Sequence, residues 1–364
     1  MEPSQHRRQL GRLAAGLLRQ GGQLHAIKSE GTIELDAIGS ALRRHLETEQ
    51  PTLDDDARER MVKTVLDHAA EALAKTEAGV ADAQLAPAER TALEAIVHVV
   101  GRPAVRFVNG RIGMVPSQLG ANDAWIAVVG TGRSSINALS ASVGRVVAGQ
   151  THLGTAWRVG DDLVVTNWHV ARHLVEEPSV GAETWRLDPS RDGACSFDLP
   201  GASGAVTFGL KELVYRAPEP EIDLAVLRLA QGSKPWPAPV DIAPSGRTGD
   251  DAELRGATIY VIGHPHRLHT SDEIERVFGL VDGSKRWSPG YVTGLRDGQE
   301  FEHDCSTLGG SSGSCIAFAD THEVIGLHFG AHTVDELTGM GEGNLALRLS
   351  SLEAHPGGKW FKDA

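Results

Sequence analysis

Cysteine is scarce in this 364-residue chain, and the three that are present are too few and too odd in number for a disulfide framework. We therefore expect reduced thiols and a reducing compartment. Long apolar runs are also missing: no stretch approaches the 18 consecutive apolar residues of a membrane-spanning helix. The basic first segment has only a short apolar run, broken by Arg19 and Gln20, unlike a secretory signal. The sequence therefore predicts a cytoplasmic protein without a membrane partner.

Positive charge is in deficit as well, because the formal net charge is −13. Sequence-independent binding of nucleic acid needs a basic surface, so we expect no nucleic-acid partner. Hydrophobic residues make up 41% and charged residues 23%, which suits two domains with buried cores. The 42 glycines against 5% aromatic residues indicate many tight turns, and hence β-structure in part of the chain.

Residues 1–100 have the apolar periodicity of helices. The pattern occurs in four runs: Leu10, Leu13 and Leu17; Ile38, Leu42 and Leu46; Met61, Val65, Leu66, Ala69 and Leu73; and APAERTALEAIVHVVG, with Pro87 in its first turn. Asp54, Asp55 and Asp56 precede the third run, where the helix dipole favours negative charge. We predict an N-terminal all-α bundle over 1–100, acting as a regulatory or interaction domain.

After Pro103 the pattern changes to short β-rich runs separated by Gly, Pro, Asp and Ser. They are VGRVVAG, GTAWRVG, DDLVVTNWHV, EIDLAVLRLA, ATIYVIGHP and HEVIGLHFG. Their even spacing predicts an all-β barrel or sandwich pair. We place a connecting segment at 101–143, with TGRSSINALS as a short helix, the β-domain at 144–352 and a C-terminal tail at 353–364.

Three strings bring together residues suited to acyl transfer. TNWHVARHL contains His169, EIDLAVLRL contains Asp223 and HDCSTLGGSSGSCIAF contains Ser312. A serine hydroxyl is a poor nucleophile until an imidazole takes its proton, and His169 is the candidate base. Asp223 would fix the imidazole tautomer and stabilise the imidazolium. We predict a catalytic triad of these three residues.

Glycines flank the candidate nucleophile. Gly310 and Gly313 allow a turn in which the amide hydrogens of Gly310 and Ser312 point at one spot. A tetrahedral intermediate would place its negative oxygen there, so we predict an oxyanion hole formed by Gly310 and Ser312.

With these motifs the sequence resembles the trypsin-like (chymotrypsin-fold) serine peptidases, especially the bacterial branch that includes glutamyl endopeptidases. The matching strings GTAWRVGDDLVVTNWHV, DLAVLRL, STLGGSSGS and EVIGLHFG follow the family's order over about residues 145–350. The resemblance implies two six-stranded barrels with the triad in the cleft between them. It also implies that His169, Asp223 and Ser312 are general base, orienting acid and nucleophile.

Two positions depart from the family pattern. Ser311 stands before the nucleophile, where secreted relatives usually have an Asp that pairs with a newly cut N-terminus. We therefore expect no activation through that ion pair. Cys315 replaces the proline that commonly follows the GSG turn, which affects the expected local geometry of the turn.

The resemblance also suggests which residues bind substrate. Thr307 and His328 match positions that hold the substrate carboxylate in glutamyl endopeptidases, and Phe329 and Gly330 continue the pocket-lining segment. Ser306 occupies the position of the Asp that gives trypsin its preference for basic residues. A histidine and a hydroxyl can donate hydrogen bonds to a carboxylate, so cleavage after Glu or Asp is a hypothesis. The alternative for His328 is a packed or water-linked histidine in the cleft wall.

Other reactive residues have simpler interpretations. His264, His266 and His269 in GHPHRLH are expected in a turn, and His303, Asp304 and Cys305 are likewise not expected to bind metal. Cys305 and Cys315 are interpreted as reduced, partly buried thiols. We expect no metal and no cofactor.

The combination of a helical module with a peptidase loosely resembles bacterial signalling and antiphage-defence (antiviral) proteases. An intracellular endopeptidase needs restraint, so we expect residues 1–100 to bind a regulatory protein partner. Two hypotheses remain: a regulated serine endopeptidase acting on a protein or peptide substrate, and a non-catalytic interaction module on a protease barrel.

Overall fold

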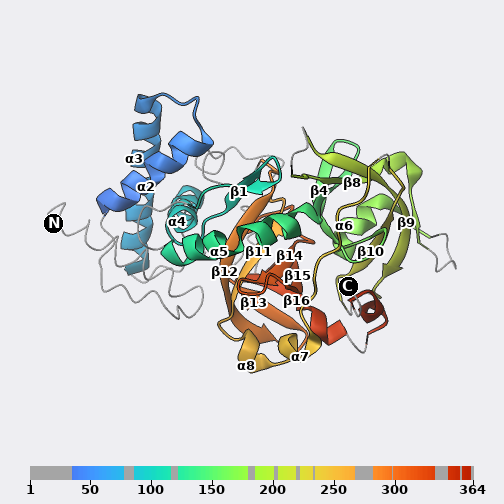
Figure 1. Ribbon diagram of the computed structural model, residues 1–364. Helices are drawn as coiled ribbons and strands as arrows, with labels where there is room; N and C mark the ends of the chain where they lie inside the picture. The colour runs from blue at the N-terminus through green and yellow to red at the C-terminus, as the bar shows by residue number, and fades with distance from the viewer. Residues whose placement is uncertain are drawn as a thin grey trace.

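A computed structural model gives the fold of most of the chain (Figure 1). It describes residues 35–77, 86–115, 122–178, 185–200, 204–218, 222–232, 234–266, 282–296, 298–332, 343–352 and 355–361. The helix expected at Leu10, Leu13 and Leu17 lies outside these ranges, as does His269. None of the helices in the described ranges combines the length and the apolar character needed to cross a lipid bilayer.

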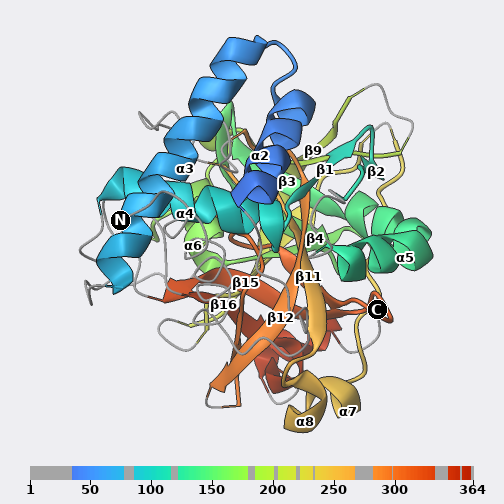
Figure 2. The same ribbon diagram turned by 90° about the vertical axis from the view of Figure 1, so that its left-hand side faces the viewer.

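Three N-terminal helices confirm three of the four predicted helical runs: α2 (Leu35–Glu49), α3 (Asp55–Glu77) and α4 (Pro87–Val100). Asp54 caps α3, since its carboxylate accepts the amide hydrogen of Ala57 at 2.7 Å. The apolar faces form a core of their own, which includes Ile38, Leu42, Leu46, Val62, Val65, Ala69, Ala92 and Ile96. Figure 1 shows these helices at the left of the molecule and the first barrel at the right, and Figure 2 views the molecule from the side of the helices.

The first barrel is a closed antiparallel sheet in the order β10-β5-β4-β3-β8-β9. Its strands are β3 (Val143–Ala148), β4 (Thr151–Arg158), β5 (Leu163–Thr166), β8 (Gly193–Phe197), β9 (Val206–Arg216) and β10 (Ala225–Leu229). Beside the barrel, β6 (Val175–Glu176) pairs with β7 (Arg186–Leu187). Inward residues such as Val146, Val164, Phe197, Phe208 and Leu227 fill the barrel interior.

The second barrel has the order β11-β14-β15-β16-β13-β12 and closes through the pairing of β11 with β12. Its strands are β11 (Thr258–Gly263), β12 (Arg286–Arg296), β13 (Glu300–His303), β14 (Cys315–Phe318), β15 (Val324–His332) and β16 (Gly343–Arg348). Two short helices, α7 (Ser245–Thr248) and α8 (Asp251–Leu254), precede it. The prediction of two six-stranded barrels is confirmed.

The segment between the helices and the first barrel is more structured than its sequence pattern indicates. It contains β1 (Val105–Val108), which pairs with β12, β2 (Arg111–Ile112), which pairs with β1, and the 19-residue helix α5 (Asp123–Ala141). We expected only a short helix here. Glycines at 130 and 132 weaken the helical signal of α5. Burial of Trp125, Val129 and Ile136 against the barrels stabilises it instead.

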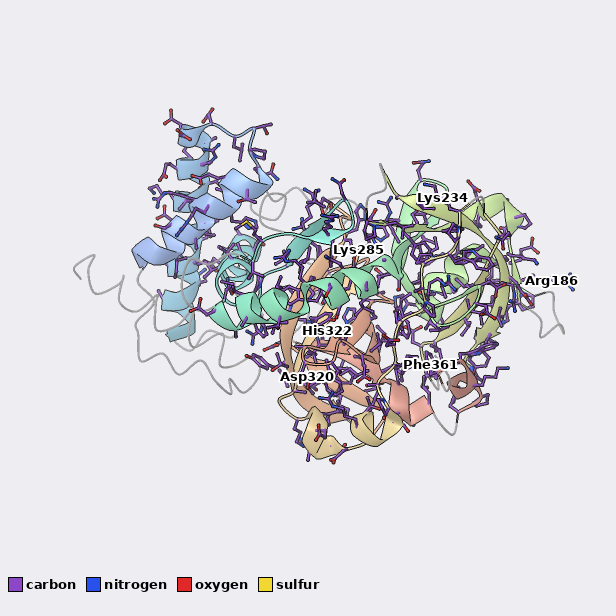
Figure 3. All side chains as sticks on the ribbon, viewed as in Figure 1. Arg186, Lys234, Lys285, Asp320, His322 and Phe361 are labelled. Atoms are coloured by element: carbon purple, nitrogen blue, oxygen red, sulfur yellow. The ribbon has the colours of Figure 1, made fainter. Side chains whose placement is uncertain are left out.

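Two contacts attach α5 and the C-terminal segment to the barrels. The buried Lys285 donates from Nζ to the carbonyl oxygen of Ser140, at the end of α5, at 2.8 Å (Figure 3). In the segment expected as a C-terminal tail, residues Pro356–Phe361 form a 3₁₀ helix. The ring of Phe361 lies 6.0 Å from that of Trp157 in β4, so this segment packs on the first barrel.

Candidate active site

His169 lies in a one-turn helix, α6 (Trp168–Ala171), directly after the buried strand β5. Asp223 contacts it twice: one carboxylate oxygen accepts the His169 backbone amide at 2.9 Å, and the other lies 2.5 Å from His169 Nδ1. The two side chains are 37% and 28% exposed, so the pair is open to solvent on one side. Because Nδ1 is engaged by Asp223, Nε2 is the nitrogen available for proton transfer.

Asn167 is a supporting residue that the sequence patterns did not single out. Its side chain is fully buried and donates from Nδ2 to the backbone oxygen of Asp223 at 3.0 Å. This bond fixes the segment that contains Asp223 relative to the segment that contains His169. The only signal in the sequence is its place two residues before His169 in TNWHV.

Ser312 lies in a tight turn that is held at several points. The Gly313 amide donates to the His328 carbonyl at 2.9 Å, and the Ser314 amide donates to the Ser311 carbonyl at the same distance. Gly313 has φ +87°, and a Cβ there would lie 1.9 Å from the Thr155 oxygen. Glycine is therefore required at 313 both by conformation and by space.

Thr155 in β4 joins this turn to the first barrel, and sequence reasoning missed it. Its amide donates to the Ser312 carbonyl at 2.8 Å, and its hydroxyl donates to the Gly310 carbonyl at 2.8 Å. The same hydroxyl oxygen accepts the His264 amide at 3.0 Å. Thr166, three residues before His169, donates from its hydroxyl to the Thr155 carbonyl at 2.7 Å. Thr155 thus connects the serine turn with the strand that leads to His169.

The geometry of one peptide bond fixes where the amide hydrogen of Gly310, a predicted oxyanion donor, points. The Gly309 carbonyl accepts the His266 amide at 2.6 Å. Since a trans peptide holds its C=O and N–H on opposite sides, the Gly310 amide hydrogen points away from His266. Within the part of the chain that the structure describes, neither the Gly310 nor the Ser312 amide donates to a protein acceptor. Both amides thus lack a protein acceptor among the described residues, and the oxyanion hole stays a prediction.

Ser312 and His169, the remaining pair of the predicted triad, have no hydrogen bond between their side chains among the described residues. Two observations place them in the same region. A Cβ on Gly154 would lie 3.0 Å from the Ser312 carbonyl oxygen and 2.7 Å from a methyl of Val170, the residue after His169. Unliganded enzymes often hold such pairs loosely, and substrate tightens them.

Thr307 and its neighbours are fixed by Asn344 in β16, a second residue that sequence reasoning missed. The Thr307 hydroxyl donates to the Asn344 side-chain oxygen, and Asn344 Nδ2 donates to the Cys305 carbonyl at 2.8 Å. The single hydroxyl hydrogen of Thr307 is therefore engaged within the protein. A substrate carboxylate would have to displace Asn344 to receive it.

His328 lies in β15 and is 3% exposed. Its Nδ1 lies 3.2 Å from Nε2 of the equally buried His303. Burial, and then the charge of His169, lowers the pKa of His328 to about 3, and burial lowers that of His303 as well. The pair is thus neutral near pH 7. Phe329 and Gly330 follow in β15 and are half-buried.

His264 and His266 lie just beyond the end of β11, and His266 forms an isolated β-bridge with Asp282 instead of the expected turn. The ring of His152 in β4 lies 4.9 Å from that of His266 and 6.3 Å from that of His264, in a cluster beside Gly310. Among the residues that the structure describes, no group of three or more His, Cys, Asp or Glu side chains is arranged to hold a metal ion.

The two departures from the family pattern have structural consequences. Ser311 is buried, and its hydroxyl oxygen accepts the Leu308 amide at 3.3 Å, so a neutral bond fixes the turn at this position. Cys315 is buried at the start of β14 and pairs with Leu327. Cys305, Cys315 and Cys195 are all free and buried, which confirms the expectation of unpaired thiols at Cys305 and Cys315.

Comparison with known proteins bears on this same region. Residues 154–327 match the family model described as the trypsin-like peptidase domain. The chain contains a trypsin-like peptidase domain. This peptidase domain includes His169, Asp223 and Ser312, and the match supports a serine endopeptidase. No curated protein matches the chain.

Several solved protease structures are similar to this chain. The Rv3671c protease in its inactive form is 18% identical, with 60% of this chain and 89% of that chain covered and a TM-score of 0.35. A serine-to-alanine mutant of Rv3671c from M. tuberculosis H37Rv is also 18% identical, with 61% and 91% covered and a TM-score of 0.36. The serine endoprotease from Yersinia pestis is 17% identical, with 63% and 66% covered and a TM-score of 0.40. The strand pairings, rather than these likenesses, establish the two barrels.

Proposed function

We propose that this protein hydrolyses peptide bonds of a protein target through Ser312, His169 and Asp223, with an acyl-enzyme intermediate. The supporting observation is the His169–Asp223 pair, with Nδ1 2.5 Å from the carboxylate and Nε2 left for proton transfer. Thr155 adds to it, because it binds the Ser312 turn and the strand leading to His169 at once.

The reaction follows from these roles. His169 Nε2 takes the proton of Ser312 Oγ as that oxygen attacks the scissile carbonyl. The amides of Gly310 and Ser312 stabilise the negative oxygen that forms. The C–N bond then breaks as His169 gives its proton to the leaving amine, and water repeats the sequence to release the acid. Asp223 stabilises the imidazolium in both halves.

Mapping of new protein N-termini tests this proposal. Cells expressing the wild-type chain should contain cleaved neo-termini that are missing from cells expressing Ser312→Ala at equal level. The same set of neo-termini in both cultures would show that Ser312 performs no proteolysis.

The substrate preference we propose is Glu or Asp before the scissile bond. His328 supports it as a buried imidazole on the strand whose backbone holds the Ser312 turn. The pKa of His328, lowered to about 3, makes this preference pH-dependent. A bound carboxylate raises the pKa of a neighbouring histidine, so binding takes up a proton. The kcat/KM for cleavage after Glu should then rise relative to that for cleavage after Gln as the pH falls.

Paired peptides that differ only in Glu or Gln before the cut provide the measurement. The ratio of their kcat/KM values should rise as pH is lowered from 8 to 6, by up to about tenfold per pH unit. The catalytic steps are shared by the two peptides, so their pH dependence cancels in the ratio. A ratio near one at every pH, or a higher rate after apolar or basic residues, would exclude the preference.

We also propose that α2–α4 bind a regulatory protein partner in the cytoplasm, in bacterial signalling or antiphage defence. These helices have a core of their own, and no predicted site residue lies in them. A photo-crosslinker at the exposed position of Lys63 in α3 should capture a partner from cells, whereas one at Lys211 in the first barrel should not. Equal capture at both positions, or none at Lys63, would argue against this role.

The alternative function is a non-catalytic interaction module built on the same barrels. The missing hydrogen bond between Ser312 and His169 is the observation that favours it. Identical neo-termini from wild-type and Ser312→Ala cells would support this alternative.

A further inference from the structure

The residues that follow α4 contact the predicted specificity region directly. We call residues 304–307 the specificity segment, because it contains Ser306 and Thr307 and precedes the Ser312 turn. Helix α4 ends at Val100, and Gly101 and Arg102 come next. Arg102 is 202 residues from Asp304 in the sequence, yet the two form an ion pair.

Arg102 is buried and contacts several partners. It is 3% exposed, and one end of its guanidinium binds Asp304. The guanidinium carbon lies 5.1 Å from the centre of the Tyr291 ring and 5.8 Å from that of Trp125. The second carboxylate oxygen of Asp304 accepts the Tyr291 amide at 2.7 Å. A buried charge whose partner is removed costs several kcal/mol, so Arg102 and Asp304 keep each other in place.

A second contact joins the same two stretches of chain. The Ser306 hydroxyl donates to the backbone oxygen of Arg102 at 2.7 Å. The carbonyl of Gly101 accepts from Arg102 Nη1 at 2.9 Å and from Trp125 Nε1 of α5 at 3.2 Å. Arg102 thus contacts the specificity segment through both its side chain and its backbone.

The helices also approach the peptidase domain at a second place. Burial, and then the charge of Arg286 in β12, lowers the pKa of His45 in α2 to about 4. Arg286 in turn donates to the Ala104 carbonyl at 3.2 Å, two residues after Arg102. Because Gly101 and Arg102 directly follow α4 in the chain, a displacement of α4 along its axis would pull on Arg102 and on the residues that hold it.

We propose that Arg102 is a positioning residue that holds the specificity segment in its substrate-binding form and links the helices α2–α4 to it. The proposal rests on the proposed peptidase function for its kinetic consequence only. A partner that moves α4 would then change substrate binding more than the chemical step, because the Ser312 turn is held separately by Thr155 and His328.

Kinetics and hydrogen exchange of the full chain test the link. Arg102→Met should raise KM for a peptide about tenfold with kcat nearly unchanged, and should speed exchange of the 304–307 amides. Arg102→Lys keeps the positive charge. Both KM and the exchange rate of the 304–307 amides should therefore return part of the way to their wild-type values. Arg247→Met is the matched control, since Arg247 also pairs with an aspartate, Asp320, and lies 4.0 Å from an aromatic ring, Phe318.

The two readouts separate the proposals. If the wild-type chain cleaves no peptide, the peptidase proposal fails, and exchange at 304–307 still decides the role of Arg102. The proposed role of Arg102 would be overturned if the 304–307 amides exchanged no faster in Arg102→Met than in Arg247→Met. It would also be overturned if Arg102→Met lowered kcat and left KM unchanged. Should Arg102→Met not fold, Ser306→Ala removes one contact only and should speed exchange in the same segment.

Discussion

Among single residues, Thr155 connects several parts of the proposed active site. It accepts hydrogen bonds from the His264 amide and the Thr166 hydroxyl, and it donates hydrogen bonds to the carbonyls of Gly310 and Ser312. The donors that would stabilise a tetrahedral intermediate must be fixed before the reaction starts. Thr155 fixes the turn that contains them.

Thr155→Val tests this role, because valine has nearly the same shape and lacks the hydroxyl. The Gly310 carbonyl and the His264 amide each lose a partner, so the Gly310 peptide becomes less well fixed. We expect kcat to fall about 10- to 100-fold with little change in KM.

Thr155→Ser restores the hydroxyl and is the control. It should recover most of kcat in the same steady-state assay. Equal kcat values for the valine and serine variants would show that the hydroxyl does not position the turn.

Among the secondary-structure elements, α5 depends on a close approach to the second barrel. A Cβ on Gly132 would lie 2.3 Å from the ring of His322, which a 3.0 Å hydrogen bond to Tyr260 holds in place (Figure 3). Gly130, two residues earlier in the same helix, has no atom within 4 Å of the equivalent position. The two glycines therefore form a natural pair for comparison.

Gly132→Ala should lower the free energy of unfolding by about 1–3 kcal/mol, because the helix must move away from the barrel. Gly130→Ala should raise it by about 0.5–1 kcal/mol, since alanine is the better helix former. Urea unfolding of both variants measures the difference. Destabilisation of equal size at both positions would contradict the close packing at Gly132.

The sequence predicts these elements unequally well, for a physical reason. The helices containing Ile38 and Val65 bury one stripe against each other, so their periodicity predicts them. The barrel strands alternate apolar and polar residues, which is also a local pattern and predicts them in the same manner. The contacts of Arg102 with Asp304, of Thr155 with Gly310 and of Asn344 with Thr307 join residues 37 to 202 positions apart, which no local pattern encodes. The same applies to β1, which pairs with the distant strand β12 as well as with the neighbouring strand β2.

Across the whole molecule, buried neutral histidines make stability depend on pH. Burial lowers the pKa of His152 to about 4 and that of His328 to about 3, and it lowers those of His264 and His303 well below 6.5. The unfolded chain binds these protons near pH 6.5, whereas the native protein does not. Stability is therefore full above pH 6.5 and falls as the pH drops toward the native pKa values.

Urea unfolding between pH 7.5 and 5.5 measures this dependence. Each such histidine should cost about 1 kcal/mol of unfolding free energy over that interval. The window lies above the pKa of unfolded carboxylates, so their titration contributes little. Stability that is constant or rises as the pH is lowered would show that these histidines are protonated in the native protein.

In the proposed mechanism, His169 activates Ser312 for nucleophilic attack. The most direct test of this step is to treat the full chain with a fluorophosphonate, digest it and locate the adduct by mass spectrometry. The adduct should form on Ser312 in the wild-type protein, disappear in Ser312→Ala and form at least about 100-fold more slowly in His169→Ala. An adduct on another residue, or equal rates with and without the imidazole, would contradict it.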